Sequence, residues 1–246
     1  MRAISMALAL AMALAVLVAG CSENVELAYD SAPTNVVVEV SSSGGLPTPW
    51  LDGAALFTLY GDGRVVKKSD ETKHVLLLVE GRLDQDSLDE LLRKIEDMGF
   101  FELENDYRNR KVMDGVTSTI AVNLVDQKKV VSNYMADVPA FADTRRAIME
   151  FPVDGLRVYI PDRGYLYVSR ESRAPENPQV PPPDIASLVP GPEKLEEAAA
   201  GRKTIELDGK PFVALKKWES TQRYVGLDIQ AGTTWYKVYP LYRPTS

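Results

Sequence analysis

The chain has 246 residues, a formal net charge of −7 at pH 7 and 45% hydrophobic residues. This hydrophobic content is normal for a globular protein and excludes disorder throughout. The length is sufficient for one large domain or two small ones, and the acidic charge gives the chain no electrostatic reason to bind nucleic acid.

The first segment has the layout of a bacterial export signal. Arg2 is followed by a run of Ala, Leu, Val and Met, and two small residues, Ala19 and Gly20, stand just before Cys21. A positive start, an apolar middle and small residues at the cleavage site are typical of secretory signals. The apolar run falls short of the ~20 residues that a membrane-spanning helix needs. We therefore expect residues 1–20 to be a lipoprotein signal peptide.

The four residues ending at Cys21, VAGC, resemble a lipobox, the site at which bacterial lipoproteins are lipidated and cut. Cys21 is the only cysteine of the chain, and a cysteine thiolate is the nucleophile that accepts the lipid. Lipidation of Cys21 predicts a protein of the bacterial cell envelope, held at the membrane by its lipid anchor. Ser22 in place of an aspartate favours the outer membrane in a cell that has two. The alternatives are an ordinary signal peptide with a chance cysteine, and an uncleaved membrane helix.

Residues 21–34 show no sustained period and are expected to form a tether. Residues 35–151 are expected to form an α+β domain. A hairpin is predicted around Gly61-Asp62-Gly63, because a tight turn needs residues that accept positive φ. Alternating or valine-rich segments predict strands at 35–40, 54–60, 64–67, 75–79, 116–125 and 129–135.

Two helices are predicted in this domain. The clearer one spans residues 84–98, where apolar residues recur three and four apart, with Asp84 or Asp86 as the N-cap and Gly99 at its end. The second spans 139–151, with Asp137 as its cap. The predicted fold class is α+β: an antiparallel sheet with two packed helices, followed by a smaller strand-rich C-terminal region.

The order of these elements resembles a group of uncharacterised bacterial secreted and lipoprotein domains. The resemblance rests on three segments, LFTLYGDGRVV, MGFFELENDY and MDGVTSTIAVNL, and covers residues 36–151. It implies a shared fold and carries no activity that can be transferred to this chain.

Residues 152–246 form the predicted strand-rich C-terminal region. Residues 171–192 are rich in proline, which favours an extended loop and excludes a central strand or helix. A short helix is predicted at 192–201, with proline near its start and glycine at its end. Strands are expected at 156–160, 165–168, 203–207, 212–215, 224–229 and 234–241.

Motifs for catalysis or metal binding were not found. His74 is the only histidine and follows a polar run, so a solvated side chain is expected. With one histidine and with Cys21 assigned to lipid, a typical zinc site is not expected. The acidic side chains of Glu102, Glu104 and Asp106 are expected to be exposed, without a substrate pocket. We therefore expect no enzyme activity, no catalytic residue and no metal or other cofactor.

The one functional indication is aromatic. More than half of the aromatic residues lie beyond Glu150, and Trp218, Trp235 and Tyr239 are the candidate ligand contacts. Two hypotheses follow, of which the first is a non-enzymatic interaction or envelope-assembly module with a protein partner. The alternative is a lipoprotein that binds a small ligand or saccharide on its aromatic C-terminal sheet. Burial of Trp235 and Tyr239 between sheet and helix favours the first, and their exposure on an open face favours the second.

Replacing the candidate lipidation residue tests the anchor. Cys21→Ser should release the protein from membranes or leave an unprocessed precursor, because no thiol remains to accept the lipid. Metabolic labelling with a fatty-acid probe should mark the unchanged chain and leave the variant unlabelled. Equal labelling of the two chains would contradict a lipid on Cys21.

Overall fold

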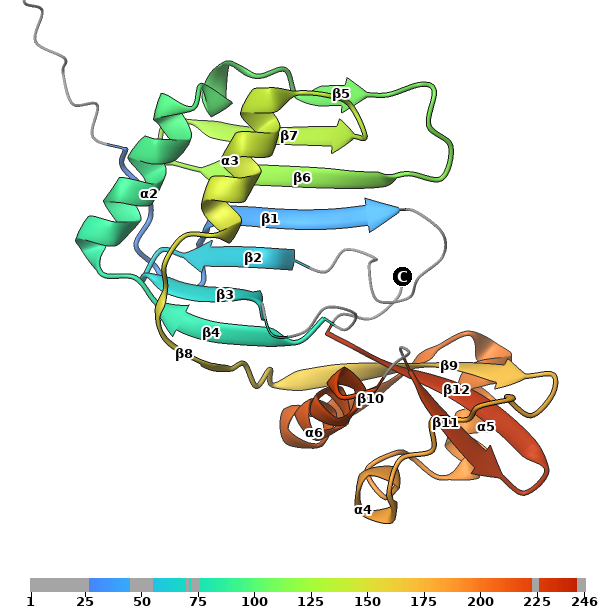
Figure 1. Ribbon diagram of the computed structural model, residues 1–246. Coiled ribbons are helices and arrows are strands. Elements are labelled where there is room, and N and C mark those ends of the chain that lie inside the picture. The colour runs from blue at the N-terminus through green and yellow to red at the C-terminus, as the bar shows by residue number, and fades with distance from the viewer. Residues whose placement is uncertain (1–26, 45–54, 70, 72–75, 223–225, 243–246) are drawn as a thin grey trace, which may run out of the picture.

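The structure is a computed structural model that describes residues 27–44, 55–69, 71, 76–222 and 226–242 (Figure 1). The predicted signal peptide, Cys21 and His74 lie outside the described residues. A search of the described part of the chain finds no helix of the length and hydrophobicity needed to cross a membrane.

Two sheets organise the chain. Sheet A has eight strands in the order β5-β7-β6-β1-β2-β3-β4-β8, and only its β5–β7 pair is parallel. Sheet B has four strands in the order β10-β9-β12-β11, all antiparallel. The strands of sheet A are β1 (Val36–Gly44), β2 (Ala55–Tyr60), β3 (Arg64–Lys68), β4 (Leu78–Arg82), β5 (Asp106–Arg108), β6 (Val116–Asn123), β7 (Lys128–Tyr134) and β8 (Asp154–Val158). Those of sheet B are β9 (Arg163–Glu171), β10 (Thr204–Asp208), β11 (Leu227–Ala231) and β12 (Thr234–Leu241).

The helix predicted at residues 84–98 is confirmed as α2 (Gln85–Asp97). Asp84 caps it, because its carboxylate accepts a 2.8 Å hydrogen bond from the Ser87 N–H. Gly99 follows the helix with φ of 71°, the left-handed conformation that lets the chain leave α2 and enter a short 3₁₀ turn at Phe100–Glu102. Both ends of α2 are therefore encoded locally.

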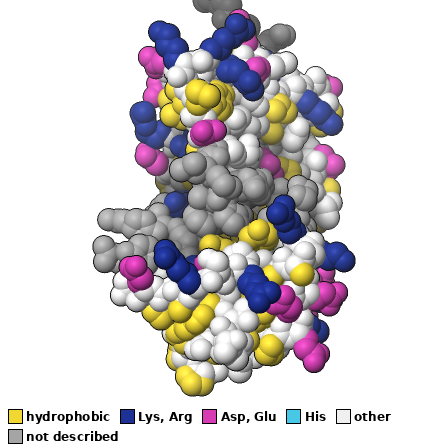
Figure 2. All heavy atoms as spheres, turned by 90° about the vertical axis from the view of Figure 1, so that its right-hand side faces the viewer, with side chains coloured by type: hydrophobic (Ala, Val, Ile, Leu, Met, Phe, Trp, Pro, Cys, Tyr) yellow, Lys and Arg dark blue, Asp and Glu magenta, His cyan; other side chains and the backbone are white. Residues whose placement is uncertain are grey.

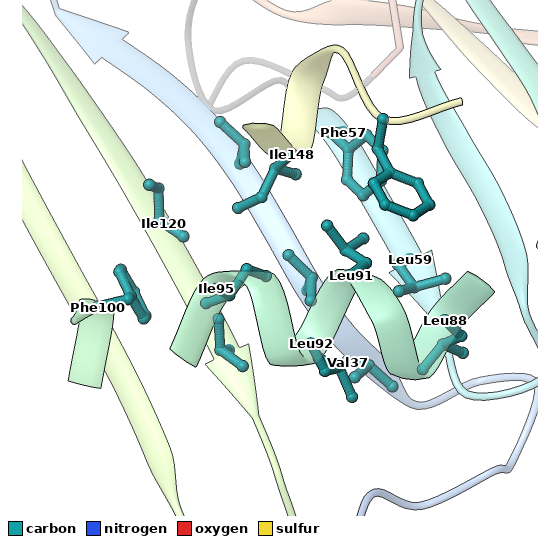
Figure 3. Close-up of a cluster of buried hydrophobic side chains, with 14 of the residues drawn as sticks. Val37, Phe57, Leu59, Leu88, Leu91, Leu92, Ile95, Phe100, Ile120 and Ile148 are labelled. Carbon is teal, nitrogen blue, oxygen red and sulfur yellow. The ribbon is translucent and has the colours of Figure 1, made fainter. Parts of the chain in front are cut away.

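The main core lies between sheet A and its two helices, α2 and α3 (Pro139–Met149), which cover the same face of the sheet (Figure 1). Leu91 points from α2 toward Phe57 and Leu59 of β2, and Leu92 lies beside Val37 of β1 (Figure 3). Ile148 enters the same cluster from α3. The spacing of apolar residues on α2 thus matches the alternation on the strands beneath it.

The predicted cap of α3 is wrong. Val138 occupies the N-cap position and makes no side-chain hydrogen bond, and Pro139 at the first helical position has no N–H and so needs no acceptor. The other end of the helix is bound by a strand residue, because the buried Lys67 ammonium donates a 3.0 Å bond to the Met149 carbonyl. This contact joins β3 to the last turn of α3 and satisfies a carbonyl that the helix leaves open.

Sheet B is also covered by helices on one face. These are α5 (Pro192–Gly201) and α6 (Gly209–Ser220). The short α4 (Pro183–Ala186) precedes them, so the expectation that the proline-rich segment 171–192 excludes a helix is wrong; Pro183 is accommodated in the first turn of α4. The Tyr236 hydroxyl of β12 donates a 2.5 Å bond to Glu196 of α5. Gly164 of β9 lies beneath Phe212 of α6, and a Cβ at this position would overlap with the aromatic ring. Glycine is therefore required for α6 to approach the sheet.

A buried ion pair fixes α6. Lys216 and Glu219 are 1% and 0% exposed, and the Lys216 ammonium lies 2.7 Å from a Glu219 carboxylate oxygen. The ammonium also donates to the Pro240 carbonyl at 3.1 Å, and the other Glu219 oxygen accepts from the Gly226 N–H at 2.7 Å. Both charges thus have partners, as burial requires.

The two sheets meet at a small cluster around Tyr242. Its hydroxyl accepts a 3.0 Å hydrogen bond from the Leu78 N–H of β4, and its ring packs edge-on against Phe212 with centroids 4.9 Å apart. Tyr159, between β8 and β9, stacks on the same ring at 6.4 Å. The end of β12 is therefore joined to sheet A by aromatic packing and one hydrogen bond.

The predicted fold class, an antiparallel sheet with two packed helices and a smaller strand-rich C-terminal region, is wrong. Sheet A is a large mixed sheet, sheet B is separate, and the described part of the chain holds five α-helices, three of them in the C-terminal region. β5 and β8 are short and mostly exposed; β5 was not predicted, and β8 overlaps the strand expected at 156–160 but begins at Asp154. They are strands because their backbones pair with β7 and β4, which is a tertiary effect.

The strand predicted at residues 212–215 is also wrong, because this segment is the middle of α6. Its short apolar run fits a strand or a buried helix equally well. The helix is selected by contacts that the sequence does not display: Phe212 on Gly164, and the ion pair of Lys216 with Glu219 one turn apart.

The core beneath α2 can be tested with two substitutions on the same helix. Leu92 is 1% exposed, so Leu92→Ala should lower the free energy of unfolding by ~2–5 kcal/mol, the range for a large-to-small core change. Lys94→Ala, at an exposed position of the next half-turn, should stay within about 0.5 kcal/mol of the unchanged chain. Urea denaturation measures both, and equal midpoints would show that the buried face is assigned wrongly.

Candidate functional site

The two sides of β12 differ sharply. Tyr236 and Val238 are buried beneath the helices of sheet B. Side chains alternate along a strand, so Trp235, Lys237 and Tyr239 lie on the opposite face, and all three are half-buried. This second face is not the one that α5 and α6 cover.

The neighbouring strand adds residues to the same face. In the register of β12 with β9, Tyr239 pairs with Tyr167, Lys237 with Ser169 and Trp235 with Glu171. Tyr165, two residues before Tyr167, shares the face and is half-buried. We call this surface the aromatic face, defined by Tyr165, Tyr167, Trp235, Lys237 and Tyr239.

The rings occupy two ends of the aromatic face. Tyr167 and Tyr239 form a tilted pair with centroids 6.1 Å apart. Trp235 precedes Tyr239 by four residues on the same strand, which corresponds to ~13 Å at ~3.3 Å per residue. A polar strip of Lys237 and Ser169 separates the two aromatic ends. One small ring cannot contact both ends at once, so a ligand that uses both must be elongated.

Lys237 is held at the centre of this polar strip. Its ammonium lies 3.1 and 3.2 Å from the two carboxylate oxygens of Asp228 on β11. Asp228 is 2% exposed and also accepts a 2.6 Å bond from the Gln179 N–H. An ammonium carries three donors. The ion pair therefore fixes the Lys237 ammonium between the aromatic ends, so this donor does not have to move when a ligand binds.

Tyr239 lies in a partly desolvated position. Burial raises the pKa of its hydroxyl to about 12, and the nearby carboxylates of Glu171 and Asp228 act in the same direction. Gly226 contributes to this burial, because it adopts φ of +87° and a Cβ there would approach Cε1 of the Tyr239 ring to 2.9 Å. Two properties thus favour glycine at position 226, its positive φ and its closeness to the ring.

The structure brings together two of the three predicted ligand contacts. Trp235 and Tyr239 share the aromatic face, whereas Trp218 lies on α6 and packs against the core of sheet B. Tyr165, Tyr167 and Lys237 were not predicted from the sequence. The alternation of Tyr165 and Tyr167 within a predicted strand was a usable signal, but the pairing of β9 with β12 was not visible.

Other clusters give weaker candidates. Among the described residues, no group of three or more His, Cys, Asp or Glu is arranged to hold a metal ion. A groove of about 410 Å³ lies between α2 and the end of α3, where Arg82 and Lys94 alternate with Glu90 and Glu150. Because basic and acidic side chains both line this groove, its charge favours neither an anionic nor a cationic ligand. The three carboxylates considered at the sequence level, Glu102, Glu104 and Asp106, are exposed, as expected.

Comparison of the chain with protein-family models, with curated proteins and with solved structures finds no match. The chemistry of the aromatic face is that of binding: ring faces for stacking, and a fixed ammonium and a hydroxyl for hydrogen bonds. Function is therefore inferred from this geometry and from the sequence.

The raised pKa of Tyr239 predicts a loss of stability in alkali. The folded pKa of about 12 exceeds the ordinary value of 10.0, so the protonated Tyr239 hydroxyl stabilises the folded state. This stabilisation is fully present below pH 10 and is lost as the pH rises toward 12. Tyr239→Phe should remove this part of the decline. Urea midpoints measured across this interval test it, and identical declines for the variant and the unchanged chain would contradict the assignment.

Proposed function

We propose that the protein is an exported lipoprotein of the bacterial cell envelope, held by lipid on Cys21, that binds an elongated saccharide on the aromatic face. It acts as a binding protein and catalyses no reaction of its own. The single observation that carries the proposal is the half-exposed position of Trp235 and of the Tyr167–Tyr239 pair on the face opposite the helices.

A saccharide fits the arrangement of this face. Each sugar ring offers an apolar surface that can stack on an aromatic ring, and hydroxyls that can bond to polar groups at its edge. The aromatic face alternates in the same way, with Trp235 at one end, Lys237 and Ser169 in the strip between, and the tyrosine pair at the other. A surface that docks a protein usually has a continuous apolar centre, which the polar strip interrupts here.

The tether would leave this face accessible. Leu27 and Tyr29 pack against the core of sheet A, so the chain enters the fold at that sheet. The segment from Cys21 to Leu27 spans at most ~20 Å even when extended. Sheet B lies at the other end of the molecule from this entry point (Figure 1). Lipid on Cys21 would therefore hold sheet A near the membrane and leave sheet B farther from it.

Removal of one aromatic end tests the proposal. Trp235→Ala should weaken binding of a soluble β-1,4-linked oligosaccharide about twofold to tenfold, as expected for the loss of ~0.5–1.5 kcal/mol of stacking. Trp235→Phe, which keeps an aromatic ring, should retain most of the affinity. Titration calorimetry measures each dissociation constant.

A matched control separates stacking from general damage. Val180→Ala changes another exposed hydrophobic residue of the C-terminal region and should leave the dissociation constant unchanged. No binding by the unchanged chain, or equal affinity of Trp235→Ala and Val180→Ala, would refute the saccharide site.

A further inference from the structure

We propose that the loop between β5 and β6, together with Met135 directly after β7, is a membrane-contacting tip, which inserts Met113 and Met135 into the surface of an anionic lipid bilayer. The tip comprises these two methionines and the basic residues Arg108, Arg110 and Lys111. It is distinct from the aromatic face, which belongs to sheet B.

The apolar part of the tip is unusually exposed. Met113 is 87% exposed and Met135 is 52% exposed, in a chain whose other large hydrophobic residues mostly form cores. Met135 and Val112 lie together, because both are close neighbours of Gly115. Methionine is flexible and polarizable, which suits contact with an irregular apolar surface. Exposed apolar groups gathered at one place indicate an interaction site.

Hydrogen bonds hold the loop in this shape. The Tyr134 hydroxyl donates to the Val112 carbonyl at 3.1 Å and accepts from the Gly115 N–H at 2.9 Å. The Asn109 side chain accepts from the Lys111 N–H at 3.0 Å and donates to the Met135 carbonyl at 3.2 Å. These hydrogen bonds hold the loop beside the methionines in one conformation, which reduces the conformational entropy that the loop loses on binding.

Backbone strain supports the same reading. Asp114 and Met135 adopt φ of 56° and 52°, the left-handed conformation that side-chain-bearing residues rarely take. Such strain persists only where surrounding contacts maintain it, and it is concentrated at functional sites. Here the left-handed residues are Met135 itself and Asp114, which directly follows Met113.

The basic residues of the tip favour contact with anionic lipids. Arg108, Arg110 and Lys111 are exposed and outnumber Asp114 in residues 108–115, while the exposed Asp106 and Asp137 lie two residues outside the tip. The chain as a whole carries a net charge of −7, so the local excess of basic residues in this loop stands out from an acidic background. Basic side chains beside an apolar tip are attracted to anionic lipid headgroups while the apolar groups enter the interface. Figure 2 shows hydrophobic side chains at this end of the molecule, beside Lys and Arg and interspersed with Asp and Glu.

The position of the tip agrees with a membrane contact, and this step rests on the proposed lipid anchor. The Val125 N–H, at the turn between β6 and β7, donates a 2.8 Å bond to the Ala28 carbonyl. The chain therefore enters the fold at the opposite end of β6 from the tip, a distance of ~25 Å for its length. Both points lie on the β5 side of sheet A (Figure 1). One bilayer can therefore meet the anchor and the tip together.

A fluorescent label reports insertion of the tip directly. In the full chain with Cys21→Ser, Met113→Cys provides one thiol for an environment-sensitive dye. On vesicles of phosphatidylcholine with phosphatidylglycerol, the dye should shift to shorter wavelength and become protected from acrylamide. High salt should reduce both effects, because it screens the attraction to the headgroups.

Two controls make the readout specific. Val180→Cys in the same Cys21→Ser chain places the dye at an exposed position outside the tip, and it should show no shift. Because both chains have the same N-terminal segment, a difference between them reports the tip. Arg110→Glu with Lys111→Glu should abolish the shift at position 113, as should vesicles of phosphatidylcholine alone.

The proposal is overturned by an unchanged spectrum at position 113 on the anionic vesicles, or by an equal shift at position 180. A shift that grows with protein concentration in the absence of vesicles would assign the tip to a second copy of the chain, and would overturn it too. Since Cys21→Ser carries no lipid, these outcomes do not depend on lipidation. A failure here leaves the fatty-acid labelling and the saccharide titration unaffected.

Discussion

The packing of α5 and α6 on one face of sheet B is the constraint on which the proposed binding surface depends. Once Tyr236 and Val238 are covered, strand geometry directs Trp235 and Lys237 to the opposite face. The Lys216–Glu219 pair keeps this arrangement, because it joins α6 to the Pro240 carbonyl of β12 and to the Gly226 N–H before β11. Loss of one partner of a buried pair costs about 3–5 kcal/mol, so a shift of α6 is strongly disfavoured.

The sequence predicts those elements whose information is local. α2 carries its period, its cap at Asp84 and its left-handed Gly99 within one segment, and it was predicted almost to its ends. β5 was not predicted, and β8 was predicted only in part, at residues 156–160, because backbone pairing with β7 and β4 sets the bounds of these two strands. α6 was missed because its choice between helix and strand depends on Gly164, a residue far away in the chain.

The same distinction applies to the candidate site. Trp235 and Tyr239 are four residues apart on a predicted strand, so their common face follows from the sequence alone. Tyr167 joins them only through the register of β9 with β12, which no local pattern encodes. Trp218 was grouped with them by residue type, and the packing of α6 separates it from them.

A lipid anchor at the N-terminal end of the chain would explain why a small tip is sufficient for membrane contact. A lipid on Cys21 would confine the chain to the bilayer, so contact by the tip becomes an intramolecular event at high effective concentration. A few basic side chains, each adding on the order of 1 kcal/mol, can then populate one orientation together with the apolar groups of the tip. In that orientation the β5 side of sheet A approaches the lipid, and sheet B, at the far end of the molecule, extends away from it (Figure 1). The same weak contact would be insufficient for a chain that diffuses freely, because it would have to overcome the entropy of association unaided.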